Sequence, residues 1–230
     1  MKNLWCFLLI ALIAGQAPNA PRQGPLGSGG GVNASDKAPN DPNDPNALLL
    51  KKWDVVIKDP NDPNQVLWTK WNAVLRVLRT TSLSAEAKGK IIDMIVSPIF
   101  DFQLMAKLVL GRKHWPKFDE SQQKKFTELF TKRLKVSYRE KISLYTDEKA
   151  VLKPMQREKT IVSIPMELIS KDKKIAIVYK LRKLGKSWRI FDVEIQGVSI
   201  LLTYRSQFDD VLRNKSVEEF LLHMENSPAP

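Results

Sequence analysis

Apolar residues between positions 59 and 145 recur every three or four places, which is the period of an amphipathic α-helix. Residues that favour helix ends stand between these runs, so the pattern predicts four helices. They are a helix after the N-cap Asn64, a helix after Ser84 that ends at Pro98, a short helix over 102–110 between Asp101 and Gly111, and a long helix after the capping pair Asp119 and Gln122. The long helix carries the widest apolar stripe: Phe126, Leu129, Phe130, Leu134, Tyr138, Ile142 and Tyr145.

From residue 150 onward apolar residues stand at every second position, which is the period of a half-buried β-strand. Strands are predicted over 161–169 and 173–184, joined by a turn at Lys171 and Asp172. A third strand follows the turn at Gly185 and Lys186. The hairpin sets one apolar row against another: Val162, Ile164, Met166 and Leu168 opposite Ile175, Ile177, Tyr179 and Leu181.

The stretch 187–210 combines both periods and is predicted to organise the fold. It begins as a strand, and Gly197 interrupts it as expected of a bulge or a close backbone approach. A second apolar run covers 198–202, and the helical period begins after Tyr204 and Arg205. A strand that bends at glycine and leads into a helix can line a concave apolar wall.

Helices followed by a meander of strands predict an α+β fold, with the helices packed on one face of a curved antiparallel sheet. A last short helix is predicted after the capping pair Ser216 and Glu219. This domain spans 59–226 and leaves a tail at 227–230. Lys2 followed by the apolar run 4–14 predicts a signal peptide over 1–17. Residues 18–58 read as a flexible tether, rich in Pro, Asn and Asp, that contains the first of two DPNDPN repeat copies (41–58 and 59–76).

The balance of charge and the rarity of cysteine and histidine restrict the classes of function. There are 37 basic and 25 acidic residues, giving a net charge of +12, so the surface attracts anions such as phospholipid head groups, nucleic acid or acidic proteins. The basic residues are scattered and form no recognised nucleic-acid motif, so that partner is not expected. The single cysteine, Cys6, lies in the N-terminal apolar run, and only two histidines occur. A disulfide and a cysteine-based metal or catalytic site are therefore excluded, and a histidine-rich zinc site is not expected.

No arrangement of residues in the sequence predicts catalysis. A nucleophile with a base, paired carboxylates and a glycine-rich phosphate loop are all missing from the pattern. His114 is predicted to be a surface-loop histidine, and Ser199 has no base that the sequence can identify. Alternation places Asp192 beside Trp188 and Ile190, where a buried acid needs a structural hydrogen bond or ion pair. We therefore expect no enzyme activity and no cofactor; an enzyme would require His114 or Asp192 to face a pocket.

Several motifs in order resemble the MlaC family of periplasmic phospholipid carriers, also called toluene-tolerance auxiliary proteins. The C-terminal signature is W-R-I-x-D-V-x-x-x-G-V-S from Trp188, followed by Y-R-x-x-F from Tyr204. FDFQLMAKLVLG at 100–111, Trp115, and QQKKFTELFTKRL at 122–134 extend the resemblance, which covers about 62–226. The turn at 171–172 looks short for the family.

The resemblance implies a soluble shuttle that carries phospholipid through the periplasm, between an outer-membrane lipoprotein complex and an inner-membrane ABC transporter bearing an MCE-domain ring. It implies an apolar cavity between sheet and helices, whereas the apolar pattern alone favours an ordinary packed core. Expected acyl-chain contacts are Leu104, Met105, Leu108, Phe130, Leu134, Tyr138, Val162, Ile164, Met166, Ile177, Tyr179, Ile190 and Val198. Tyr204 and Arg205 are expected near the mouth and the head group. The alternative is a cavity-free interaction module of the same fold, which bridges envelope complexes without holding lipid.

Overall fold

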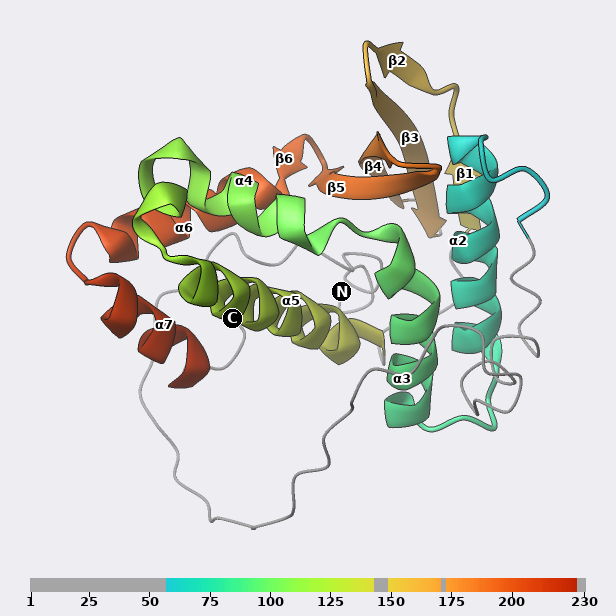
Figure 1. Cartoon of the computed structure of the whole chain (residues 1–230). Helices are drawn as coiled ribbons and strands as arrows, with labels where there is room; N and C mark the ends of the chain where they lie inside the picture. The colour runs from blue at the N-terminus through green and yellow to red at the C-terminus, as the bar shows by residue number, and fades with distance from the viewer. Residues whose placement is uncertain (1–56, 143–148, 171–172, 227–230) are drawn as a thin grey trace.

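The structure is a computed structural model that describes residues 57–142, 149–170 and 173–226 (Figure 1). The predicted signal peptide, the tether up to residue 56, the turn at 171–172 and the tail at 227–230 lie outside the described residues. The helices are α2 (Pro63–Arg79), α3 (Ala85–Val96), α4 (Phe102–His114), α5 (Glu120–Ile142), α6 (Ile200–Leu212) and α7 (Val217–Asn226), with short 3-10 helices η1 (Ser97–Ile99) and η2 (Trp115–Lys117). The strands are β1 (Lys149–Leu152), β2 (Gln156–Glu158), β3 (Ile161–Ser170), β4 (Lys173–Leu184), β5 (Ser187–Ile195) and β6 (Val198–Ser199).

The sheet is antiparallel throughout, with the strand order β1-β3-β4-β5-β6 and β2 paired to β3, which confirms the predicted α+β class. The register of the β3–β4 hairpin is the predicted one, because Ile164 lies opposite Tyr179 and Met166 opposite Ile177. All eight residues of these two apolar rows are buried. The period-two pattern thus determined both the pairing and the face that enters the core.

Most helix boundaries follow the predicted caps. Ser84 and Asp101 each accept a backbone N–H of the helix that they precede. The capping pair Asp119 and Gln122 is formed in both directions, at 2.8 and 3.0 Å. Gly111 also ends the regular part of α4 as predicted, because its φ of 63° breaks the helix before one more turn.

The first helix begins two residues earlier than predicted. Its N-cap is Asp62, whose Oδ1 accepts the backbone N–H of Asn64 at 2.9 Å, so the prediction of Asn64 as the cap is wrong. Pro63 explains the difference, because a proline lacks the N–H that the first helical position leaves unbonded and its φ already suits a helix.

The stretch around Gly197 folds differently from the prediction. Gln196 and Gly197 have φ of 49° and 79°, so they form a tight turn that reverses the chain from β5 into β6. The bulge lies instead at Phe191, since Lys180 pairs with Asp192 while Leu181 pairs with Ile190. Helix α6 begins at Ile200, before the predicted start, so most of the apolar run 198–202 is helical.

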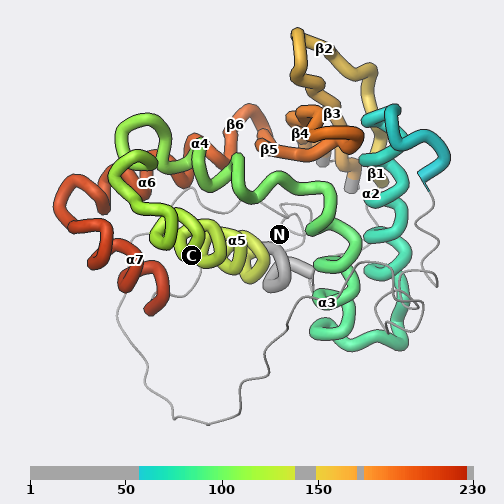
Figure 2. Tube along the Cα trace, viewed as in Figure 1, coloured from blue at the N-terminus to red at the C-terminus, as the bar shows by residue number. Residues whose placement is uncertain are grey.

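The helices form two groups around the sheet (Figures 1 and 2). Helices α4 and α6 run side by side, with α5 and α7 packed beneath them, and α2 pairs with α3. A cluster of aromatic rings joins the first group: Phe118, Phe126, Phe130, Tyr204, Phe208 and Phe220. The main core then continues from these rings to the apolar rows of β3 and β4.

Candidate functional site

The apolar layers do not close completely on each other. A cavity lies where α2, the segment from η1 to α4, the C-terminal part of α5 and the start of α6 meet the inner face of β4 and β5. About 890 Å³ within its walls holds no protein atom, part of it open to solvent, and the centre of a water molecule fits into only about 80 Å³. Most of this space is therefore too narrow to admit a water molecule. Its lining residues are Leu67, Lys70, Trp71, Val74, Val96, Ile99, Phe100, Phe102, Met105, Leu134, Ser137, Tyr179, Ile190, Val193, Ile200 and Tyr204.

Helix α2 contributes one continuous edge of this wall. Leu67, Lys70, Trp71 and Val74 have the i, i+3, i+4, i+7 spacing, which brings them onto one face of a helix. The aliphatic stem of Lys70 can pack along this apolar face while its ammonium group stays near water. The wall from α2 is therefore apolar with one basic position.

The opposite wall depends on a buried carboxylate. Asp192 accepts hydrogen bonds from Ser199 Oγ at 2.8 Å, Val193 N at 2.9 Å and Leu201 N at 3.3 Å. Ser199 Oγ in turn accepts the N–H of Leu202 at 3.2 Å and caps α6. Burial raises the pKa of the Asp192 carboxyl, against these hydrogen bonds. This network fixes the point where α6 leaves the sheet, and so places Ile200 against the cavity.

The predicted structural role of Asp192 is confirmed, although its predicted neighbours are wrong. The bulge at Phe191 moves Asp192 to the face of Lys180, away from Ile190. Asp192 does not line the cavity. A bulge of one residue inverts the alternation that follows it, which the spacing of apolar residues did not reveal.

Besides Lys70, the polar side chains in the cavity wall are Ser137 on α5, Tyr204 on α6 and Tyr179 on β4. Tyr204 is fully buried, and burial raises the pKa of its hydroxyl to about 12, with Ser137 beside it. Burial also raises the pKa of Tyr179. Both hydroxyls are therefore neutral at physiological pH, and the wall that they help to form suits a hydrocarbon better than an ion.

Comparison with known proteins assigns the chain to a family. Residues 69–226, more than half of the chain, match the family described as MlaC protein. This chain belongs to the MlaC family. A solved structure of a phospholipid-binding protein from Ralstonia solanacearum, in complex with a phospholipid, has a similar fold, with a TM-score of 0.64 and 19% sequence identity. The similarity covers 71% of this chain and 95% of that one.

Membership of the MlaC family confirms the prediction that the chain is not an enzyme, since MlaC proteins are lipid carriers. Among the residues that the structure describes, no three His, Cys, Asp or Glu side chains gather as a metal site would require. Within the same part of the chain, no helix has the length and apolar character that crossing a membrane requires.

The MlaC-family chain brings only some of the predicted acyl-chain contacts to the cavity. Met105, Leu134, Tyr179 and Ile190 line it, as does Tyr204. Another group belongs to the packed core beside it, with exposed fractions of 2% or less: Phe130, Val162, Ile164, Met166 and Ile177.

The remaining predicted residues lie elsewhere. Leu104, Leu108 and Arg205 line a groove on the outer side of α4, and the Arg205 side chain covers Gly111. Val198 is 54% exposed at the β5–β6 turn. The side chain of Tyr138 lies outside the described residues. The sequence did not distinguish the predicted contacts that line the cavity from those in the core or at the surface, because the apolar ones all lie on regular apolar stripes. Only the packing of the layers decides which stripe borders the cavity.

Sequence reasoning missed most of the wall from α2 and the segment before α4. Leu67, Trp71 and Val74 stand on the predicted apolar face of their helix, yet nothing in the spacing shows that this face borders a cavity. Lys70 gave no signal, because a lone lysine beside an apolar stripe is common on solvated helices. Val193 and Ile200 reach the wall only through the bulge and the early start of α6.

His114 does not lie in an exposed loop as predicted. It is 4% exposed at the end of α4, and its Nε2 lies 2.7 Å from Asp209 Oδ1. Lys113 donates to the same oxygen at 2.7 Å and Arg213 to the other at 3.0 Å. These bonds lower the pKa of Asp209. The pair of His114 and Asp209 links α4 to α6, and it was missed because the two residues lie far apart in the sequence. Within the described residues, no hydroxyl is hydrogen-bonded to His114.

Proposed function

We propose that this MlaC-family protein is a carrier that holds an acyl chain of a phospholipid in the cavity between the sheet and the helices. The observation that carries the proposal is the apolar space that the chain's own side chains leave unfilled. Interiors of ordinary domains are close-packed, so an apolar space left open between two layers is typical of a ligand site. The Ralstonia solanacearum protein of similar fold, which was solved with a phospholipid, supports the same reading.

The energetics of an acyl chain favour enclosure over a surface groove. Burying a methylene group contributes about 0.8 kcal/mol, so a tail of sixteen carbons gains roughly 13 kcal/mol of gross transfer free energy. A groove that hides half of the tail forgoes about 6 kcal/mol of this. About 80 Å³ of the space admits the centre of a water-sized group, and each such group needs about 10–15 Å³ by this measure, so the cavity as it stands takes about five to eight methylene groups. A whole tail of sixteen carbons therefore requires the layers to separate.

The contacts that we propose for the acyl chain are the predicted residues that line the cavity, joined by those from α2. They are Met105, Leu134, Tyr179 and Ile190, with Leu67, Trp71, Val74, Val193 and Ile200. The predicted contacts that lie in the packed core form the wall behind them: Phe130, Val162, Ile164, Met166 and Ile177. A cavity-free interaction module has no use for such a space, so the cavity weighs against that alternative.

The finer part of the proposal concerns transport. The apolar N-terminal run 4–14 supports export, and the family resemblance supports exchange of phospholipid in the periplasm with an outer-membrane lipoprotein complex and an inner-membrane MCE-domain ABC transporter complex. Nucleic acid is not among the proposed partners.

Extraction of lipid from the purified protein, followed by mass spectrometry, tests the carrier function. We expect phospholipid to co-purify, or to enter the lipid-free protein from vesicles. Protein that contains no lipid after purification and takes up none from vesicles would contradict the proposal.

A further inference from the structure

A groove on the outer side of α4 lies apart from the cavity. It encloses about 830 Å³ and is open to solvent. Its lining residues are Leu104, Lys107, Leu108, Gly111, Arg112, Trp115, Pro116 and Arg205. Four of these residues are apolar and three are basic, and no acidic residue is among them. The groove shares no lining residue with the cavity, so it is a separate surface with its own chemistry.

Helix α4 separates the two spaces. Leu104, Lys107 and Leu108 stand at positions i, i+3 and i+4, so they share one face of the helix. Met105 is buried on another face, where it lines the cavity. Leu108 is 38% exposed although it is a large apolar residue. One face of α4 thus serves the interior, and the other presents leucine and lysine side chains to the outside.

Helix α6 extends this surface beside α4. Leu202 and Arg205 lie three residues apart on α6 and line a second hollow between the two helices, and Leu202 is 64% exposed. The guanidinium group of Arg205 packs against Gly111, where an added Cβ atom would lie only 2.9 Å from Arg205 Cζ. Gly111 also has a φ of 63°, which favours glycine. This close packing holds the charge of Arg205 at the groove.

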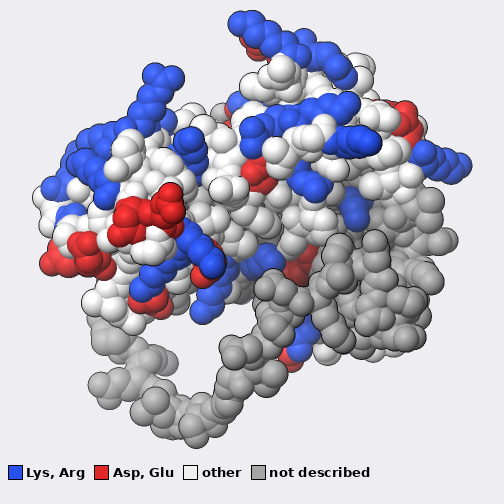
Figure 3. Space-filling model, viewed as in Figure 1, with Lys and Arg blue, Asp and Glu red and all other residues white. Residues whose placement is uncertain are grey.

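The basic groups of the groove lack an acidic partner. Throughout the part of the chain that the structure describes, no carboxylate lies within ion-pair distance of Lys107, Arg112 or Arg205. Asp209, the acid of the neighbouring hollow, already accepts a hydrogen bond from Lys113 at 2.7 Å. Figure 3 shows Lys and Arg side chains gathered over the end of α4, whereas Asp and Glu lie lower, toward the start of α5 and α7. The charge of the groove is therefore available to an anion from outside.

The chemistry of the groove favours a partner that supplies hydrogen-bond acceptors. Lysine, arginine and tryptophan side chains donate hydrogen bonds and accept none, and leucine and proline side chains do neither. The side chains of the groove therefore offer donors alone. The face of a bilayer that contains anionic lipids presents phosphate oxygens, which are negatively charged acceptors, above an apolar interior. A protein surface mixes donors with acceptors, and its own donors would find no acceptor among these side chains.

We propose that the outer groove, together with Leu202, docks on a phospholipid bilayer with anionic head groups. Leucine and tryptophan side chains enter the boundary between head groups and acyl chains, while lysine and arginine bind the phosphates. Each basic residue near such a surface strengthens binding about fivefold. The inference goes beyond the proposed carrier function, because docking does not require lipid in the cavity.

Co-sedimentation of the full-length protein with vesicles tests the docking surface. One set of vesicles contains equal amounts of phosphatidylcholine and phosphatidylglycerol, and the other contains phosphatidylcholine alone. We expect the wild type to bind the mixed vesicles at least about tenfold more strongly, and to bind them less strongly as the salt concentration rises. Lys107→Gln combined with Arg112→Gln should weaken this binding about tenfold or more. Leu202→Asn should weaken it about fivefold, because less apolar surface enters the bilayer.

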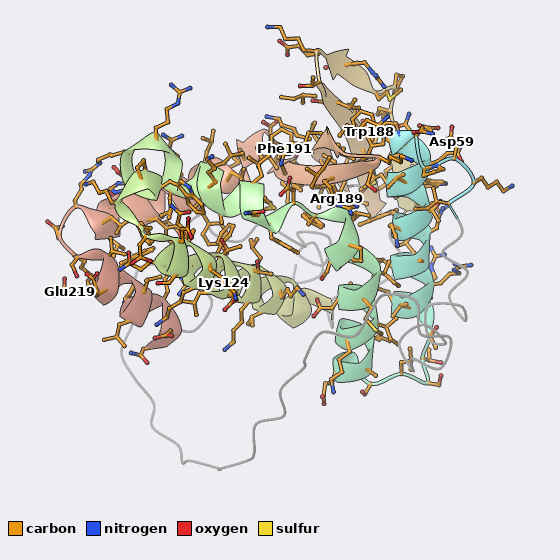
Figure 4. The ribbon with its side chains drawn as sticks, viewed as in Figure 1. Asp59, Lys124, Trp188, Arg189, Phe191 and Glu219 are labelled. Carbon is orange, nitrogen blue, oxygen red and sulfur yellow. The ribbon has the colours of Figure 1, made fainter. Side chains whose placement is uncertain are left out.

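Matched controls remove the same kinds of group elsewhere. Lys124→Gln combined with Lys186→Gln removes two exposed lysines, from α5 and from the β4–β5 turn, and Figure 4 shows Lys124 below α4. Leu222→Asn removes a leucine that is 57% exposed on α7. Both controls should bind as the wild type does, and so should Leu108→Trp, because tryptophan suits the bilayer interface. Equal losses in the lysine control and in the groove variant would show that net charge alone drives binding, which would overturn the site.

Further outcomes separate docking from other causes. Leu134→Trp enters the cavity and leaves the outer groove unchanged, so this variant should dock as the wild type does. Loss of docking in Leu134→Trp would assign vesicle binding to the cavity and overturn the inference, as would equal binding of the wild type to both kinds of vesicle. Binding of polyglutamate that depends on Lys107 and Arg112, without binding to the mixed vesicles, would assign the groove to an acidic protein instead. Lipid uptake, measured on the same samples, reports the carrier function separately.

Discussion

Replacing Leu134 by tryptophan should separate a cavity that holds lipid from an ordinary packed interior. Leu134 lines the cavity from α5, so the larger indole ring projects into the space that we assign to the acyl chain. If the ring displaces four to eight methylene groups, binding loses about 3–6 kcal/mol. A loss of that size lowers the affinity by at least about a hundredfold.

The same substitution should cost the lipid-free protein little stability. The indole enters existing space, and filling a cavity commonly leaves the free energy of unfolding unchanged or raises it by about 0.5–2 kcal/mol. In a close-packed core it would instead cost about 1–3 kcal/mol. Ile164→Trp provides this second case within the same protein, because Ile164 is 0% exposed on β3 and does not line the cavity.

The assay combines lipid quantification with denaturant unfolding of delipidated protein. Leu108→Trp is the matched control, since Leu108 is 38% exposed in the outer groove and the same substitution there should leave lipid uptake as in the wild type. Leu134→Trp protein that still carries wild-type amounts of lipid would refute the reasoning. So would a loss of stability as large as that of Ile164→Trp.

Three other substitutions test separate parts of the structure. Asp192→Ala leaves three buried hydrogen-bond donors without an acceptor and should lower the free energy of unfolding by about 2–4 kcal/mol in denaturant titration. A loss below about 1 kcal/mol would contradict the role given to this network. Burial raises the pKa of Asp93 to about 6, above its unfolded value of about 3.9, so its ionised form opposes folding above pH 6 and the penalty vanishes below about pH 4. Asp93→Asn should therefore raise the free energy of unfolding by up to about 3 kcal/mol at pH 8 and by little at pH 4, and an equal gain at both pH values would show that ionisation is not the cause. Trp188→Phe removes the hydrogen bond to Asn61 and should cost about 0.5–1.5 kcal/mol in thermal unfolding; no change would mean that this bond does not hold β5 to α2.

Local rules predicted the elements of this fold well, because each depends on residues close in sequence. The pairs Asp119 with Gln122 and Ser216 with Glu219 form the predicted caps in both directions. The alternating rows of β3 and β4 predicted their own register. Both Asp62 and Asn64 can cap a helix, and Pro63 favours Asp62 because proline suits the first helical position.

The site was harder to predict, because a cavity is a property of how layers fit. Met105 and Phe130 carry the same apolar signal, yet Met105 lines the cavity and Phe130 stacks against Phe126 in the core. The bulge at Phe191 and the pairing of His114 with Asp209 likewise join features that the sequence separates or conceals. Only the arrangement in three dimensions shows where apolar side chains leave room.

The central claim is that the space between sheet and helices belongs to a lipid tail. Native mass spectrometry of the purified protein, before and after organic extraction, tests it most directly. The account predicts a protein heavier than its own denatured polypeptide by the mass of one phospholipid, and a return to the polypeptide mass after extraction. Protein that already has the mass of its polypeptide alone, and that keeps it after incubation with phospholipid vesicles, would contradict the claim.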